Sequence, residues 1–332
     1  MNAALRTDLS WRSIRSILLV LAGLGFSALG IGLIVRVINP DQLVLTLGSI
    51  QWSWIGGAVL ATLATYAART KRWIILLRPL KFRESAVLRA LLSGQLLNQL
   101  LPVRLGDVIR TLLLAREPDG SFARIFGSLL IEKAWDWLAL CVLIIIIAWV
   151  IPLPDWLLTP ARSIGLLAAL IVIGFVAAAL MPERLISHGL ARIEASLAQW
   201  PARWRTFTLD NLRRLLDSLS VLRRRDTLIG AASWTAITWG LGIVVNYGVQ
   251  RAFGFDSWLA AAVLLVVLML GIALPPSIGA VGVFEGLSML TLSTFGVPLE
   301  TALAIGLLLH LVVSVPLIIG TGLAWLVAAR KI

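Results

Sequence analysis

The segment LLNQLLPVRLGDVIRTLLLAR, residues 96–116, carries Arg104, Asp107 and Arg110 inside a run that is otherwise apolar enough to lie in a membrane. Charged side chains in hydrocarbon are costly, so they usually face a bundle interior or a water-filled cavity, where they mark a substrate or ion path. Arginine suits a phosphate because its guanidinium group binds two oxygens at once. Asp107 and Arg110 share a helix face, and Asn98 adds a neutral contact. The pattern therefore predicts a site for a phosphate-bearing group.

A second set of ionisable residues follows further along the chain. Glu132 and Asp136, in GSLLIEKAWDWLALCVLIIII, are four residues apart and share one face of an apolar helix, whereas Lys133 lies on another face and is expected to extend toward the membrane edge. Glu285 and His310 lie in later apolar segments. These groups would contact a cationic or hydroxyl-rich headgroup or carry a coupling proton. The alternative is purely structural: buried ion pairs, a turn capped by Glu285, and a hydrogen bond of His310.

Two apolar regions, 90–116 and 257–296, are each interrupted near the middle by a similar motif, LPVRLG at 101–106 and LPPSIG at 274–279. Proline removes a backbone donor, and glycine adopts conformations closed to other residues. Such backbone is tolerated at membrane depth only where it is buried in protein or lines a watery cavity. We therefore predict two re-entrant hairpins. The expected turn residues are Pro102, Gly106, Pro275, Pro276, Gly279 and Gly282.

The composition indicates a polytopic membrane protein. Of 332 residues, 59% are hydrophobic and only 14% are charged, and the mean hydropathy is +0.93. Apolar runs of about 18 or more residues recur, as in membrane-spanning helices. The net charge of +12 does not indicate nucleic-acid binding, because arginines cluster between the apolar runs, where the positive-inside rule places them in the cytoplasm.

These patterns predict an all-α fold in a single transmembrane domain, residues 1–332, of the cell (inner) membrane with both termini in the cytoplasm. The six expected spans are residues 15–37, 52–69, 122–151, 162–181, 228–250 and 299–328. The loop after residue 69, which includes Arg72, and the segment 183–226 are rich in arginine and are expected inside. Segment 183–226 has amphipathic spacing, which predicts two helices broken near Pro201. It would lie on the inner leaflet or pack as a connector under the bundle.

The order of the elements predicts an inverted repeat. A span, a broken segment and a second span occur twice, at about 52–151 and 228–328, and the two copies run through the membrane in opposite directions. Interrupted apolar segments in matching positions of two inverted halves indicate the binding site of a transporter.

Several function classes are excluded by the absence of their motifs. The chain has no HExxH, GxSxG, Walker A or dinucleotide-binding GxGxxG motif, so we expect neither an enzyme nor a cofactor. The only cysteine, Cys141, lies in an apolar run, so no intrachain disulfide forms and no zinc or other metal site is expected.

Three ordered motifs carry a family resemblance. NQLLPVRLGDVIR, LIEKAWDW and PPSIGAVGVFEG resemble, in turn, the N-x-x-L-P-x-R-x-G-E-x-x-R, E-R-x-x-D and P-x-x-x-G-G-x-G-x-x-E elements of the lysylphosphatidylglycerol synthase transmembrane-domain family, also described as flippase-like. Asp107 stands where the family often has glutamate, Lys133 where arginine is common, Ala280 where it has glycine, and His310 where we expect arginine.

The resemblance, which covers essentially the whole chain, implies movement of a lipid between bilayer leaflets. Bifunctional members of the family also carry a cytoplasmic aminoacyl transferase. Nothing similar is present here, so lysylphosphatidylglycerol synthesis is not implied. The resemblance widens the candidate substrates to glycolipids and polyprenyl phosphates. The alternatives are a non-transporting scaffold for a lipid-modifying enzyme or glycosyltransferase, and a small-solute transporter. Self-association stays open.

Overall fold

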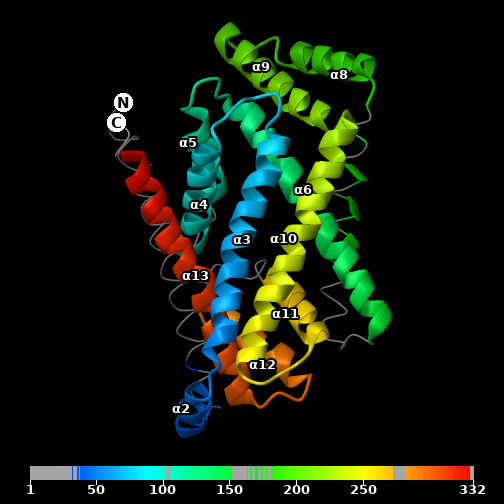
Figure 1. The fold of residues 1–332 in the computed structure, drawn as a ribbon. Helices are drawn as coiled ribbons and strands as arrows, with labels where there is room; N and C mark the ends of the chain where they lie inside the picture. The colour runs from blue at the N-terminus through cyan, green and yellow to red at the C-terminus, as the bar shows by residue number, and fades with distance from the viewer. Residues whose placement is uncertain are drawn as a thin grey trace, which may run out of the picture. The chain divides into compact units, whose positions relative to one another are not determined.

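The computed structural model describes residues 38–101, 105–151, 181–271 and 281–329, together with isolated positions within 32–36 and 163–177. All regular elements in this part of the chain are helical (Figure 1). They are, in order, α2 (Pro40–Gly48), α3 (Trp52–Leu76), α4 (Glu84–Leu100), α5 (Gly106–Ala115), α6 (Phe122–Val150), α8 (Glu183–Ser196), α9 (Ala202–Leu219), the short 3₁₀ helix η1 (Ser220–Arg223), α10 (Arg225–Ala252), α11 (Trp258–Gly271), α12 (Val283–Ser293) and α13 (Leu299–Ala329).

Three of these helices are long and apolar enough to cross a membrane, namely α6, α10 and α13. The pair α2 and α3, which bends by 82° at residues 49–51, brings the number to four if it is one span. These helices match four of the six predicted spans. The other two, 15–37 and 162–181, fall largely outside the described residues.

The prediction for the first basic loop was wrong at its start. The span expected at 52–69 continues as α3 to Leu76, so Arg72 belongs to a helix rather than to a cytoplasmic loop. The apolar residues that follow it, Trp73 to Leu76, allow the helix to continue, and Trp73 and Leu76 are themselves fully buried. The helices predicted on either side of Pro201 are confirmed as α8 and α9.

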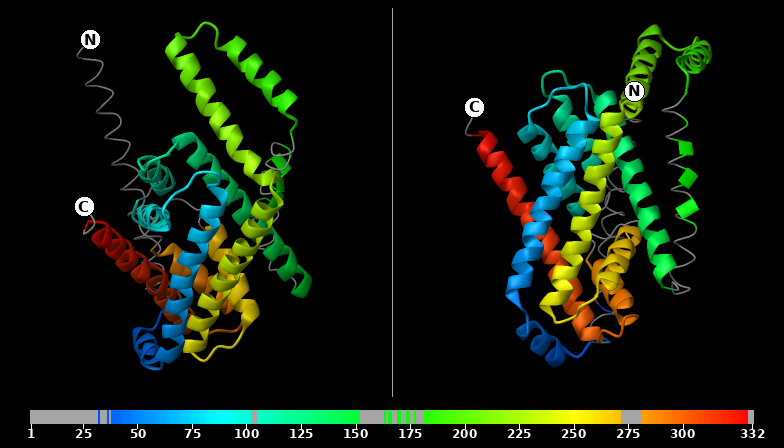
Figure 2. Two further views of the ribbon diagram at one scale, coloured as in Figure 1. Left: turned by 45° about the horizontal axis from the view of Figure 1, so that its top comes forward. Right: turned by 45° about the vertical axis from the view of Figure 1, so that its right-hand side comes forward.

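The residues divide into two compact units. Unit 1 comprises Met1–Leu63, Gly94–Gly106 and Gly242–Leu323, and unit 2 comprises Ala64–Ser93, Asp107–Leu241 and Ala324–Ile332. In unit 2, α9 packs along α6 and α8 folds back on α9 (Figure 2). The core there includes Leu76, Ile131 and Ala231.

In unit 1, α11 packs against α12 and is buried along most of its length. Its all-apolar sequence fits a helix that is enclosed on every side. The predicted break in region 90–116 is confirmed, since α4 ends at Leu100 and α5 begins at Gly106. In region 257–296, α11 ends at Gly271 and α12 begins at Val283, and the motif predicted to interrupt the helix, residues 274–279, lies outside the described residues. The turn residues Pro102, Pro275, Pro276 and Gly279 lie outside the described residues.

Gly106 shows how the chain turns back on α4. Its N–H donates a hydrogen bond of 2.8 Å to Asn98 Oδ1. A Cβ atom at this position would lie 1.9 Å from the backbone oxygen of Gly94. Only glycine permits so close an approach of two backbones, and the start of α5 is therefore fixed against α4.

Candidate functional site

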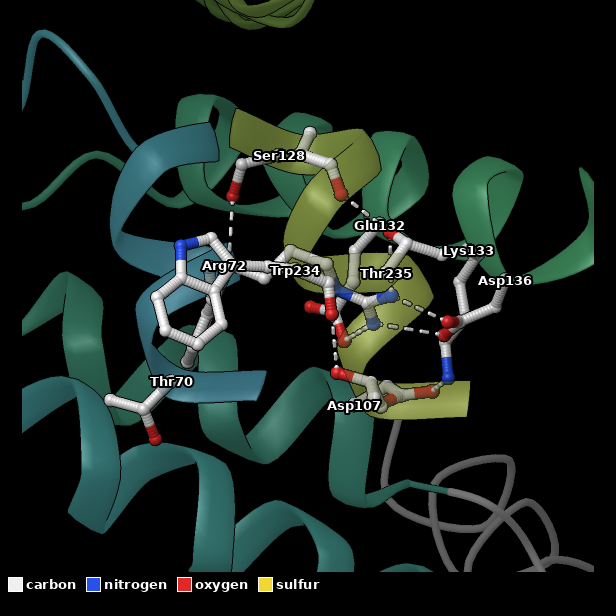
Figure 3. A network of polar contacts seen from close by, with 12 residues as sticks. Thr70, Arg72, Asp107, Ser128, Glu132, Lys133, Asp136, Trp234 and Thr235 are labelled. Carbon is white, nitrogen blue, oxygen red and sulfur yellow. Dashed lines mark hydrogen bonds and ion pairs between the residues drawn. The ribbon is translucent and has the colours of Figure 1, made fainter. Parts of the chain in front are cut away.

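Arg72 is the centre of a network of charged side chains in unit 2 (Figure 3). Its side chain is 0% exposed. Nη1 and Nη2 donate to the two oxygens of Asp136, at 2.7 Å and 3.1 Å. Nη2 also donates to Glu132 Oε1, and Nη1 to Thr235 Oγ1, each at 3.2 Å. This is the two-pronged geometry in which a guanidinium group binds a carboxylate or a phosphate.

Glu132 joins Arg72 to a second buried arginine. Its Oε2 lies 3.2 Å from Arg110 Nη1, and the side chains of Glu132 and Arg110 are 4% and 3% exposed. The prediction that Glu132 and Asp136 share a face of α6 is confirmed, because one guanidinium group binds both. One carboxylate therefore lies between two cations, away from solvent.

Asp107 and Lys133 form the more accessible side of the network. Asp107 Oδ1 lies 3.2 Å from Arg110 Nε, which confirms the expected pairing along one helix face. Asp107 Oδ2 lies 3.1 Å from Lys133 Nζ, with side-chain exposures of 25% and 45%. The prediction that Lys133 extends toward the membrane edge was therefore wrong. Its side chain turns back to Asp107, the carboxylate that Arg110 also contacts.

Three basic and three acidic side chains make the network electrically balanced: Arg72, Arg110, Lys133, Asp107, Glu132 and Asp136. Removing a charge from water costs several kcal/mol per ion, and partners repay that cost only with good geometry. The hydrogen bonding is incomplete, since the buried Nε of Arg72 has no hydrogen-bond partner among the described residues. A buried donor without a partner is costly.

Aromatic side chains contact two members of the network, Arg110 and Asp136. The Arg110 guanidinium carbon lies 4.8 Å from the centre of the Trp73 ring, within the range of a cation–π contact. Trp73 Nε1 donates to Ser128 Oγ at 3.1 Å, and Trp239 Nε1 donates to Asp136 Oδ1 at 3.4 Å. The rigid indole rings of Trp73 and Trp239 therefore help to orient Arg110 and Asp136.

Three further predicted site residues, Asn98, Glu285 and His310, have other partners among the described residues. Asn98 serves the turn at Gly106 rather than the charged groups. Glu285 and His310 meet each other in unit 1, where His310 Nδ1 lies 2.8 Å from Glu285 Oε1. Glu285 also accepts a hydrogen bond from the N–H of Gly282, as the capping alternative predicted. Arg104 lies outside the described residues.

Sequence reasoning missed Arg72 and Thr235. A basic cluster after an apolar run is usually at the membrane edge, so the residues R-T-K-R at 69–72 favoured a loop. The sequence nevertheless contained a signal. Helical spacing places Arg72 in line with Ala61, Ala68 and Leu76, and the structure buries all four. No group of three or more His, Cys, Asp or Glu side chains arranged to hold a metal ion occurs in the described parts of the chain.

Comparison with known proteins places the chain in a family. A curated relative named glycosyltransferase AglD, from Haloferax volcanii, is 26% identical over 123 residues, which are 36% of this chain and 20% of that protein. The match thus spans about a fifth of that relative's length. No solved structure matches the chain. The family model of the lysylphosphatidylglycerol synthase TM region matches residues 20–320, and the chain, a multi-pass membrane protein, belongs to this family.

Proposed function

We propose that the protein moves a lipid with a phosphate-bearing headgroup between the leaflets of the membrane. The observation that carries the proposal is the balanced network of six charged side chains around Arg72 and Arg110, within helices that are otherwise apolar. Intramembrane charges of this kind are retained at substrate or ion paths. Membership of the lysylphosphatidylglycerol synthase TM region family supports a lipid as the substrate.

Arg72 and Arg110 would hold the phosphate. Arg72 already binds a carboxylate in the two-pronged geometry that suits phosphate oxygens, and Arg110 lies 3.2 Å from two carboxylates. A headgroup phosphate would therefore replace Asp136 or Asp107 as their partner. These two carboxylates are the accessible acidic members of the network, with 26% and 25% of their side chains exposed. Once displaced, they would be free to contact a cationic or hydroxyl-rich part of the headgroup. Arg104, which follows Pro102 in sequence, would add a third basic group.

The membrane topology forms part of the proposal. The two hairpins, 90–116 and 257–296, would enter the cell (inner) membrane from opposite sides within an inverted repeat of six spans, with both termini in the cytoplasm. The protein would act without catalysing a covalent reaction. The relative named glycosyltransferase AglD adds glycolipids to the candidate substrates, beside aminoacylated phospholipids and polyprenyl phosphates.

A second candidate function is favoured by the pairing of the charges. Among the described residues, each charged member of the network has an oppositely charged partner within 3.2 Å. Such a network can fix helices together without binding a substrate. The protein would then be a scaffold for a separate lipid-modifying enzyme or glycosyltransferase.

Lipid movement in proteoliposomes distinguishes the two functions. Vesicles with the purified protein would receive fluorescent forms of an anionic, an aminoacylated and a glycosylated lipid. We expect one class to cross faster than in empty vesicles, and Arg110→Gln to abolish that excess. The matched control is Arg78→Gln, because Arg78 also pairs with a carboxylate, Asp226 at 3.2 Å, but is 48% exposed. Folded wild-type protein that moves none of the three lipids would contradict transport and favour the scaffold.

A further inference from the structure

A buried carboxylate and imidazole pair lies in unit 1. Glu285 is 4% exposed, and its Oε1 lies 2.8 Å from Nδ1 of His310, whose side chain is 16% exposed. Glu285 is in the first turn of α12, and His310 is in the middle of α13. A charged side chain inside apolar helices is a candidate functional group, and the proposed phosphate site does not include this pair.

The packing of α12 on α13 brings the pair together. Gly306 is one turn before His310, and a Cβ atom there would lie 2.9 Å from Cβ of Ser288. Ser288 is itself fully buried and follows Glu285 by three residues on the same helix. The missing side chain at Gly306 lets the two helices approach closely enough for a short contact between Glu285 and His310.

The hydrogen bonds assign the proton positions. Glu285 Oε2 accepts from the N–H of Gly282 at 2.6 Å, at the positive φ of 84° that starts α12. A carboxylate that already accepts from the backbone is best placed to accept at its other oxygen as well, so His310 Nδ1 donates to Oε1. The partner of one ring nitrogen decides the state of the other, which makes Nε2 of His310 the position that gains or loses a proton.

The charge of the pair depends on that proton. With a neutral imidazole the pair carries one negative charge, and with an imidazolium it is neutral overall. An uncompensated charge in apolar surroundings is far more costly than a matched pair. The Phe284 ring centre lies 4.9 Å from that of the imidazole, within the range of a cation–π contact when the imidazole is protonated. The overall neutral pair is the state without an uncompensated charge.

The helices that pack around this pair carry few other ionisable groups, and those groups are far from the pair in sequence. Helix α11, which packs on α12, contains no ionisable side chain, and the only other one in α13 is Glu300, in its first turn. The remaining ionisable side chains described in this unit lie at or before helix ends or near the α10–α11 loop: Arg36, Asp41, Tyr247, Arg251 and Asp256. None of them has a contact with Glu285 or His310 among the interactions of the described residues.

We propose that Glu285 and His310 form a proton-binding site, which takes up one proton from water at His310 Nε2 and returns it to water, and that this proton is the coupling ion for lipid movement. The inference rests on the proposed function for its second part only. Proton binding by the pair can be measured without any transported lipid, so the two parts can fail separately.

The first experiment measures the protonation of His310 directly. The chain has only two histidines, and His188 is exposed on α8, so the variant His188→Gln leaves a single imidazole in the full chain. Its ¹⁵N resonances would be followed by NMR in lipid nanodiscs from pH 5 to pH 9. We expect one reversible protonation at Nε2, at a midpoint that changes in Glu285→Gln. An imidazole whose charge is constant over this range would overturn the proposal.

The second experiment tests coupling in proteoliposomes with a pH gradient of either direction. His310→Arg keeps a cation beside Glu285 but cannot release its proton. His310→Asn keeps a hydrogen-bond donor but cannot bind a proton. We expect a several-fold effect of the gradient on lipid movement by the wild type and none in either variant. Wild-type movement that ignores the gradient would overturn the coupling. Wild-type protein that protonates His310 but moves no lipid would instead contradict the proposed function.

Discussion

Arg72 and Asp136 are joined by two parallel hydrogen bonds, of 2.7 Å and 3.1 Å, although 64 residues separate them in the chain. Arg72 is fully buried, whereas a quarter of the Asp136 side chain is exposed. The pair thus has one member fixed in the interior and one that is partly exposed. A phosphate arriving at Asp136 would find a guanidinium group already oriented to bind it.

Loss of the Arg72 side chain should strongly destabilise the protein. The variant Arg72→Gln would leave Glu132 and Asp136 with one buried cation fewer, and breaking a buried ion pair costs about 3–5 kcal/mol. The free energy of unfolding, measured by titration with SDS in mixed micelles, should fall by roughly that amount. The same measurement on Arg78→Gln should show a change of about 0–1 kcal/mol, as is typical of exposed pairs. Equal losses in both variants would contradict the central position of Arg72.

Replacing the whole pair should separate stability from transport. Apolar residues in place of a buried ion pair are often neutral or stabilising, so the double variant Arg72→Met with Asp136→Leu should unfold at about the wild-type SDS concentration. Glu132 keeps Arg110 as its partner in this variant. Lipid movement in proteoliposomes should nevertheless be lost, because the phosphate has lost one of its two arginines. A stable double variant that still moves lipid at the wild-type rate would show that the pair is structural.

The long apolar helices could be predicted closely from the sequence, since hydropathy alone defines them. The segment predicted at 122–151 is observed at Phe122–Val150, and that predicted at 299–328 at Leu299–Ala329. The charged site could be predicted only in part. Asp107, Arg110, Glu132 and Asp136 stand out because apolar residues surround them, and the structure brings all four together.

Arg72 could not be recognised in the same way, because its burial depends on distant residues. It follows Arg69 and Lys71 in the sequence, and clustered basic residues at the end of an apolar run normally contact lipid headgroups. What keeps Arg72 inside is the pair of carboxylates on α6, 60 and 64 residues further along the chain. Hydropathy describes each segment separately and does not contain that pairing.

The N-terminal part of α9, residues 202–207, which is mostly exposed, should contact the cytoplasmic surface of the membrane. Trp200, Trp204 and Phe207 are each more than half exposed, and Arg203 and Arg214 lie on the same side of the helix by their spacing. Aromatic and basic residues in this arrangement are typical of helices at the interface of anionic lipids.

A spin label on Phe207→Cys, in a Cys141→Ser background, should show contact with oxygen dissolved in the bilayer in nanodiscs that contain anionic lipid. A label on Thr206→Cys, one residue away on another side of α9, should be more accessible to a water-soluble relaxation agent, and equal accessibility at both positions would argue against this orientation.

A single added methyl group at Gly106 should have a large effect. In Gly106→Ala the new Cβ would lie 1.9 Å from the backbone oxygen of Gly94, a clash that only a shift of α5 relative to α4 can relieve. That shift would also break the hydrogen bond from the Gly106 N–H to Asn98. We expect a loss of roughly 2–4 kcal/mol in the free energy of unfolding, the upper range for single substitutions, together with a loss of lipid movement.

Gly286→Ala is the matched control for this substitution. Gly286 lies in α12, and no atom is within 4 Å of the position that its Cβ would take. Alanine is favoured over glycine inside a helix by about 1 kcal/mol, so this variant should unfold at the same or a higher SDS concentration than the wild type. If Gly106→Ala were equally well tolerated, the close contact between α5 and α4 would not exist in the membrane, and the predicted hairpin at residues 90–116 would have to be abandoned.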